Sequence, residues 1–108
     1  MDSTLERLYA VVLGRKANPQ EGSYTCYLFD KGLDKILKKV GEECAETIIA
    51  AKNDAASDTI GEISDLIYHL MVMMAEKGIP LEAVLSELDR RAQKIGNLKQ
   101  MKQVDKES

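Results

Sequence analysis

Two pairs of acidic residues are the features of this sequence best suited to chemistry. Glu43 and Glu46 form the first pair, and Glu62 and Asp65 form the second, each with a spacing of three. Residues three apart are neighbours on a helix, so each pair would place two carboxylates on one face. Hard oxygen ligands of this kind suit Mg²⁺ or Mn²⁺, which keep several waters and accept substrate phosphates in the open positions. The pattern therefore predicts a metal site that handles phosphate groups.

The alternative interpretation is that these acids are ordinary surface residues without a function, because acidic residues three apart are common on solvated helix faces. Against it, both pairs border apolar faces of consecutive long helical segments. If these helices pack antiparallel, the carboxylates converge across one groove, where their repulsion is costly without a cation. The residues alone leave both interpretations open.

Other reactive side chains lie near these acids in the sequence. Lys38 and Lys39 precede the first pair and are candidate phosphate contacts, although either could be an ordinary helix-face charge. His69 is the single histidine, and we interpret it as a partly buried residue that needs no special role, with a hydrogen bond to a carboxylate as the alternative. Cys26 and Cys44 fall on apolar faces without a nearby histidine. We interpret both as small core residues with free thiols.

The elements that must position these groups are helices. Apolar residues recur at helical spacing through nearly the whole chain, and no segment shows the sustained alternation of a strand. This predicts an all-α bundle with four main helices, at residues 4–14, 33–52, 59–77 and 80–95. A short element at 24–32 fits either a helical turn or a strand. The segment 66–74 is apolar almost all round, which predicts a homodimer interface there.

Length and composition limit the class of protein. The chain has 108 residues, 44% of them apolar and 31% charged, which suits one small globular domain. We assign this domain to residues 1–96 and expect the polar segment 97–108 to form a disordered tail. A net charge of -3 argues against nucleic-acid binding, and no apolar stretch suits a signal peptide or a membrane span. We expect a cytoplasmic protein without membrane or nucleic-acid partners.

The acidic pairs and their neighbours resemble a known enzyme family. With Glu42, they match the Glu-Glu-x-x-Glu and Glu-x-x-Asp signature of the all-α MazG-like nucleotide pyrophosphatases. Within that superfamily, the runs Lys-Val-Gly-Glu-Glu, Asp-Leu-Ile-Tyr-His-Leu and Gly-Ser-Tyr-Thr resemble the phosphoribosyl-ATP pyrophosphatase family of histidine biosynthesis. The likeness covers about residues 5 to 95, and it contains no fused cyclohydrolase domain, so we expect the stand-alone form.

The resemblance implies a reaction and a set of site residues. The reaction is hydrolysis of phosphoribosyl-ATP to phosphoribosyl-AMP and pyrophosphate, by metal-activated water that attacks between the α and β phosphates. The implied metal ligands, for Mg²⁺ or Mn²⁺, are Glu43, Glu46, Glu62 and Asp65. The implied catalytic residues are these four and Glu42, which has an outer role or activates the water. The implied substrate contacts are Tyr24, Thr25, Lys38, Lys39 and His69.

Two other functions stay open at this point. A house-cleaning nucleoside triphosphate pyrophosphatase of the same fold would share the four metal ligands and differ in the residues that bind the base and the sugars. A non-catalytic helical interaction module would instead carry solvated acids and use its apolar helix only to bind a partner. Magnesium-dependent release of pyrophosphate separates the enzymes from the module.

Overall fold

The computed structural model describes residues 3–94, and every regular element in this range is a helix. The helices are α1 (Thr4–Ala17), α2 (Tyr24–Lys31), α3 (Leu33–Lys52), α4 (Ala56–Lys77) and α5 (Leu81–Lys94). The all-α prediction is confirmed for this part of the chain. There are five helices here rather than four, because the short 24–32 segment forms a helix and not a strand. The expected tail, 97–108, lies outside the described residues.

Local sequence signals set most of these helix ends. Ser3 and Glu6 form the predicted capping box, in which each side chain accepts a hydrogen bond from the other residue's backbone N–H. α1 continues three residues past the predicted end at Gly14 and stops before Asn18, whose successor is a proline. The residue before a proline is disfavoured in helical conformation, so the helix cannot extend further. Before α5, Gly78 ends α4 in the left-handed region, with φ of 72°.

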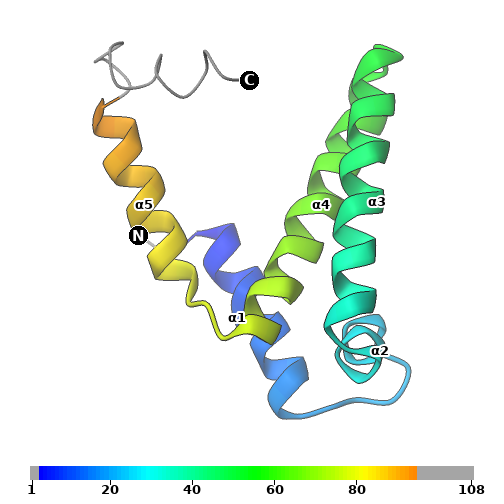
Figure 1. Ribbon diagram of the computed structural model, residues 1–108, viewed down its shortest axis with the longest axis vertical. Helices are drawn as coiled ribbons and strands as arrows, with labels where there is room; N and C mark the ends of the chain where they lie inside the picture. The colour runs from blue at the N-terminus through cyan, green and yellow to red at the C-terminus, as the bar shows by residue number, and fades with distance from the viewer. Residues whose placement is uncertain (1–2, 95–108) are drawn as a thin grey trace.

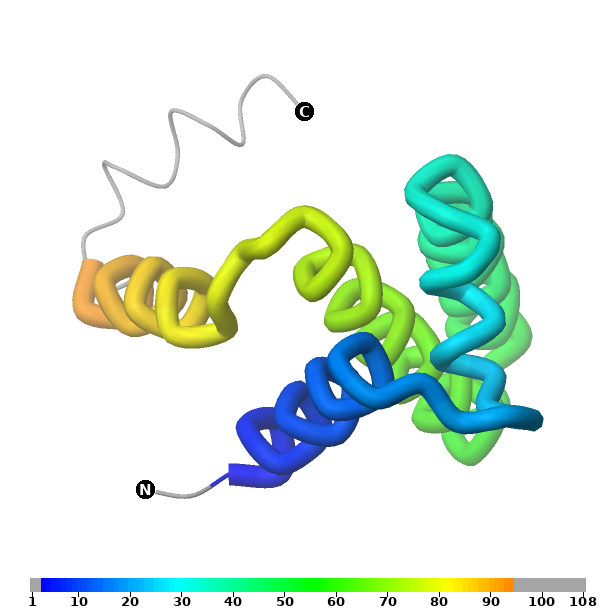
Figure 2. Tube along the Cα trace, turned by 90° about the horizontal axis from the view of Figure 1, so that it is seen from below, coloured from blue at the N-terminus to red at the C-terminus, as the bar shows by residue number. Residues whose placement is uncertain are grey.

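α3 and α4 form a long antiparallel hairpin whose two helices lie side by side (Figure 1). α1 and α2 pack against this hairpin, whereas α5 extends away from α3 (Figures 1 and 2). The core lies where α1 and α2 meet α4 and the start of α3. Its buried residues are Tyr9, Val12, Leu28, Ile36, Met71, Val72, Met74, Ala75 and Leu81. Within residues 3–94, no helix is both long and apolar enough to cross a membrane.

The helical spacing of Ile36, Val40, Cys44 and Ile48 predicts one core face on α3, and this prediction is wrong over the middle and end of the helix. Cys44 is exposed, and Ile48 is 69% exposed, although helical spacing placed both with the buried Ile36. The side of α3 that faces α4 instead buries Glu43 and Ala50. Periodicity identifies an apolar stripe, but the neighbouring helix decides which side is covered. The same applies at the start of α4, where Ile60 is 65% exposed.

The structure also gives a different role to much of the segment 66–74. Met71, Val72 and Met74 are buried within the core of a single protomer. The segment 66–74 is apolar on most sides because α4 is covered by α1, α2 and α3 in this region. These three residues therefore belong to the core of one protomer, and they are not exposed for the homodimer interface predicted there.

Candidate functional site

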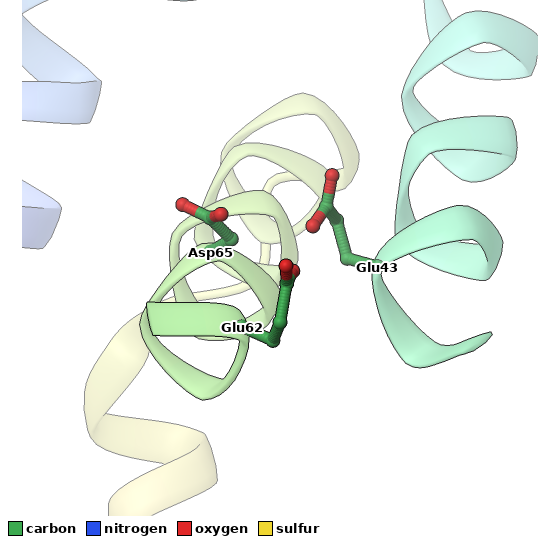
Figure 3. Close-up of side chains that lie close together, drawn as sticks. All are labelled: Glu43, Glu62 and Asp65. Carbon is green, nitrogen blue, oxygen red and sulfur yellow. The ribbon is translucent and has the colours of Figure 1, made fainter. Parts of the chain in front are cut away.

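Three of the predicted metal ligands come together between α3 and α4. Carboxylate oxygens of Glu43, Glu62 and Asp65 all lie within 4.8 Å of one another. Figure 3 shows Glu43 reaching from α3 toward the two acids of α4. The hairpin explains the arrangement, because it aligns one turn of α3 with the turn of α4 that carries Glu62 and Asp65. Glu43 is buried, Glu62 is half-buried and Asp65 is exposed, so the cluster opens to solvent on one side.

The polar atoms of this cluster fit a cation. Oε1 of Glu43 and Oε1 of Glu62 are buried without a hydrogen-bond partner. Burial raises the pKa of Glu62, and the charge of Glu46, a hydrogen bond with it, and the charges of Glu43 and Asp65 raise it further. Glu46 therefore also lies at the cluster. Several carboxylates close together, two of them with an unpartnered buried oxygen, are the donor set that a hard divalent ion such as Mg²⁺ prefers.

A groove of about 400 Å³ leads away from the acids toward the connection between α3 and α4. It is lined by Glu46, Ile49, Ala50, Asn53, Ser57, Asp58, Gly61, Glu62 and Asp65. Three of the four predicted metal ligands thus border an open space rather than a closed cavity. Such an opening is what a metal site needs if the ion is to keep waters or accept phosphate oxygens.

Thr47 is a site residue that the sequence reasoning missed. Its hydroxyl oxygen lies 2.7 Å from the backbone oxygen of Glu43 and 3.3 Å from that of Glu62. The hydroxyl donates to these carbonyls and so connects the backbones of two acidic residues on different helices. Its position one turn after Glu43 is the signal that could have identified it.

The two candidate lysines have different surroundings. Lys39 Nζ lies 3.3 Å from Glu42 Oε1 and 3.6 Å from Glu43 Oε2. Burial lowers the pKa of Lys39, but the hydrogen bond to Glu42 and the nearby negative charges outweigh it and raise the pKa overall. Lys38 is exposed and, within residues 3–94, forms no ion pair with these acids. The structure thus brings Lys39 to the site and leaves Lys38 outside it.

His69 is held inside the protein through both ring nitrogens. Nδ1 lies 2.7 Å from the backbone oxygen of Asp65, and a carbonyl oxygen only accepts, so Nδ1 carries the proton. In the neutral ring, Nε2 then accepts a hydrogen bond from the Tyr24 hydroxyl, 3.1 Å away. His69 is buried, and the partner of its Nδ1 is a backbone carbonyl rather than the carboxylate of the alternative interpretation. With both nitrogens used, His69 orders the region around Asp65.

The Gly-Ser-Tyr-Thr run connects α2 to α4. Next to the Tyr24–His69 bond, the Thr25 hydroxyl hydrogen bonds to the hydroxyl of Tyr68. Burial raises the pKa of Tyr68, and the bond to Thr25 opposes that rise. Tyr24 and Thr25, predicted as substrate contacts, therefore use their hydroxyls to hold α2 against α4. The residue Tyr24 as a whole is still 45% exposed beside the site.

Comparison with known proteins gives one consistent result. A family model described as phosphoribosyl-ATP pyrophosphohydrolase matches residues 5–92. The chain is 56% identical over 95 residues to phosphoribosyl-ATP pyrophosphatase of Clostridium novyi, covering 88% of this chain and 86% of that protein. It is 55% identical over 101 residues to that of Listeria monocytogenes, covering 94% and 97%. It is also 59% identical over 90 residues to the histidine biosynthesis bifunctional protein HisIE of Caldanaerobacter subterraneus, of which it spans only 44%.

Proposed function

The chain belongs to the phosphoribosyl-ATP pyrophosphohydrolase family, and from this premise we propose that it hydrolyses phosphoribosyl-ATP to phosphoribosyl-AMP and pyrophosphate. The family match confirms the resemblance predicted from the motifs. It favours this reaction of histidine biosynthesis over a house-cleaning pyrophosphatase and over a non-catalytic module. The observation that carries the proposal is the family match over 5–92, the range that holds every acid of the cluster.

We further propose that the reaction depends on Mg²⁺ held by Glu43, Glu46, Glu62 and Asp65. The unpartnered buried oxygens of Glu43 and Glu62 support this assignment. When bound, the cation supplies neutralisation of phosphate charge and activation of the attacking water, with Mn²⁺ as an expected substitute. A bound cation would relieve the mutual repulsion of the acids, which the ammonium group of Lys39 beside Glu43 offsets only in part.

The other side chains of the site have supporting roles in this proposal. Lys39 contacts a phosphate group, because its ammonium group already lies beside Glu43, at the edge of the acid cluster. Glu42 has the outer role, since its carboxylate holds Lys39. His69, Tyr24 and Thr25 fix α2 and the backbone of Asp65. No covalent intermediate is needed, because the nucleophile is water.

We propose a homodimer as the working form. The supporting observation is a set of large apolar side chains left exposed on α3 and α4, one of which, Ile49, lines the groove beside the acids. Its members are Ile48, Ile49, Ile60 and Ile63, which are 69%, 59%, 65% and 43% exposed. Monomeric proteins rarely leave such a group uncovered, and a second copy is the usual cover for it. The proposed interface therefore differs from the 66–74 segment predicted from the sequence.

We propose the cytoplasm as the location of the reaction. Cys26 and Cys44 are both free, which suits a reducing compartment. The family is one of biosynthetic enzymes that act on a nucleotide. Fractionation of cells that produce the protein, with the activity followed in each fraction, tests this placement.

The test of the proposed function is a substrate panel. Pyrophosphate release is measured with phosphoribosyl-ATP and with the ordinary ribo- and deoxyribonucleoside triphosphates, each with Mg²⁺ and with a chelator. We expect Mg²⁺-dependent release with a clear preference for phosphoribosyl-ATP. Preferred hydrolysis of an ordinary triphosphate would point to the house-cleaning enzyme. Absence of release from every substrate would point to the non-catalytic module.

A further inference from the structure

A pair of exposed aromatic rings next to the acid cluster has no role in the chemistry proposed so far. Tyr24 and Tyr27 lie one turn apart on α2 and are 45% and 42% exposed. Their rings stack, with centroids 6.0 Å apart and planes 23° from parallel. Together with the loop at residues 19–23, they line a surface groove of about 650 Å³. The ring of Tyr24 also contacts the rings of Tyr68 and His69, so a ligand has access only to the exposed part of each ring of the pair.

The charges around this groove select the kind of ligand. The ionisable acids that line it are Glu21 and Asp30. Lys31 lies over the ring of Tyr27, 5.7 Å from its centroid, so one basic group stands beside the two acids. A phosphate group would be repelled by the remaining negative charge. A flat, neutral ring with amino hydrogens fits better, because it can stack on tyrosine and donate to a carboxylate.

Tyr24 lies near both this groove and the acid cluster, since it lines the groove and the charges of Lys39 and Glu43 act on its hydroxyl group. One side of this residue lines the groove, and its hydroxyl lies 3.1 Å from His69 Nε2. The other nitrogen of His69 lies 2.7 Å from the backbone oxygen of Asp65, one of the proposed metal ligands. A nucleotide whose phosphates reach the acids can therefore place its base on the tyrosine pair.

We propose that this groove binds the adenine ring of the nucleotide substrate by stacking against Tyr24 and Tyr27. The inference rests on the proposed function, because it takes the substrate to be an adenine nucleotide held by its phosphates at the acids. It adds a base-binding subsite on α2 and the loop before it. Binding affinity here comes from the aromatic faces, and the acids beside them orient the amino group of the base.

The kinetic test compares Tyr27→Ala with Tyr27→Phe. Loss of one stacking ring should raise KM for phosphoribosyl-ATP about tenfold, with kcat close to that of the parent, because stacking contributes equally before and during the reaction. Tyr27→Phe keeps the ring and should keep the parent KM. Leu88→Ala, which removes a 57% exposed side chain on α5, is the matched control. An unchanged KM in Tyr27→Ala, or an equal rise in the Phe variant, would overturn the inference.

A binding test separates the groove from the reaction. AMP and ribose 5-phosphate are titrated without metal, and tyrosine fluorescence is the signal because the chain has no tryptophan. We expect AMP to bind the parent at least about tenfold more tightly than ribose 5-phosphate, through stacking of the base. This difference should disappear in Tyr27→Ala and persist in Tyr27→Phe. Equal binding of the two probes by the parent would overturn the inference without any variant.

The two proposals can fail separately. If the parent releases no pyrophosphate but prefers AMP through Tyr27, the proposed function is wrong and the base site stands. If the parent hydrolyses phosphoribosyl-ATP and Tyr27→Ala keeps the parent KM, the function stands and the base site is wrong.

Discussion

Glu43 and Glu62 lie on opposite sides of the α3–α4 contact, and each buries its Oε1 without a hydrogen-bond partner (Figure 3). Buried carboxylate oxygens normally have partners, so this pair works against the stability of the protein alone. Lys39 compensates only in part, since its ammonium group is 3.6 Å from Oε2 of Glu43. The hairpin thus holds two charges close together at a cost in stability, an arrangement found where function requires it.

The structure predicts different effects for two adjacent lysines. Lys39→Gln should lower kcat/KM for pyrophosphate release at least about tenfold, because a charge-assisted phosphate contact is lost. It should also lower the stability of the metal-free protein, since the positive charge beside Glu43 disappears. Lys38→Gln is the matched control and should behave like the parent, because Lys38 is exposed and outside the site. The measurement is steady-state kinetics on both variants. Equal losses of kcat/KM in the two would contradict the placement of Lys39 inside the site and of Lys38 outside it.

The exposed isoleucines predict the oligomeric state. Light scattering at micromolar concentration should give the parent twice the chain mass of 12.0 kDa. Ile60→Asp should shift the protein to 12.0 kDa, because a charge cannot be buried unpaired in an apolar interface. Leu88→Asp changes a residue on α5 that is 57% exposed, against 65% for Ile60, and should leave the dimer intact. A parent that scatters as a monomer would remove the dimer proposal.

Acid should weaken α5 in a way that depends on Glu87. Hydrogen bonds from Arg90 and Arg91 lower the pKa of Glu87 to about 2. A carboxylate with a lowered folded-state pKa stabilises the protein above its unfolded pKa, and this contribution is lost as pH falls toward the folded value. Glu87→Gln should therefore melt below the parent at pH 7, and the difference should shrink between about pH 4 and pH 2. Melting curves across this range, showing a constant difference, would mean that these ion pairs contribute nothing.

The positions of the long helices and the pairing of the acids could be predicted from the sequence. α3 follows the predicted range of 33–52, and a spacing of three placed Glu62 beside Asp65. The rotation of α3 about its axis could not be predicted, and Ile48 became exposed instead of buried. An apolar stripe has the same period whether a neighbouring helix or a second copy of the chain covers it.

Contacts between residues far apart in the chain could not be predicted from the sequence either. The bond between Tyr24 and His69 joins residues 45 positions apart, and it depends on how α2 lies on α4. Thr47 reaches Glu62 across the hairpin for the same reason. A hydroxyl or an imidazole ring could hydrogen bond to many polar groups in the chain. Which group becomes the partner depends on how the helices pack, and the sequence does not specify that.

The last prediction concerns Glu62, which both the spacing of the acids and the geometry of the cluster single out as a candidate metal ligand. Glu62→Gln keeps the size of the side chain and removes its charge. If Glu62 holds Mg²⁺, the rate should fall at least about a hundredfold, the scale of losing an electrostatic catalytic group. The metal-free protein should be as stable as the parent or more stable. The reason is that burial and the charges of Glu46, Glu43 and Asp65 all disfavour the ionised form of Glu62 and raise its pKa.

Activity and metal-free stability should therefore move in opposite directions in this variant. The control is Glu82→Gln, which neutralises an exposed acid on α5. A surface acid of this kind should leave activity unchanged and shift stability by no more than about half a kcal/mol. The measurements are pyrophosphate release at saturating Mg²⁺ and melting curves with and without Mg²⁺. Near-normal turnover in Glu62→Gln, or the same rise in melting temperature with Mg²⁺ as in the parent, would show that Glu62 is not a metal ligand.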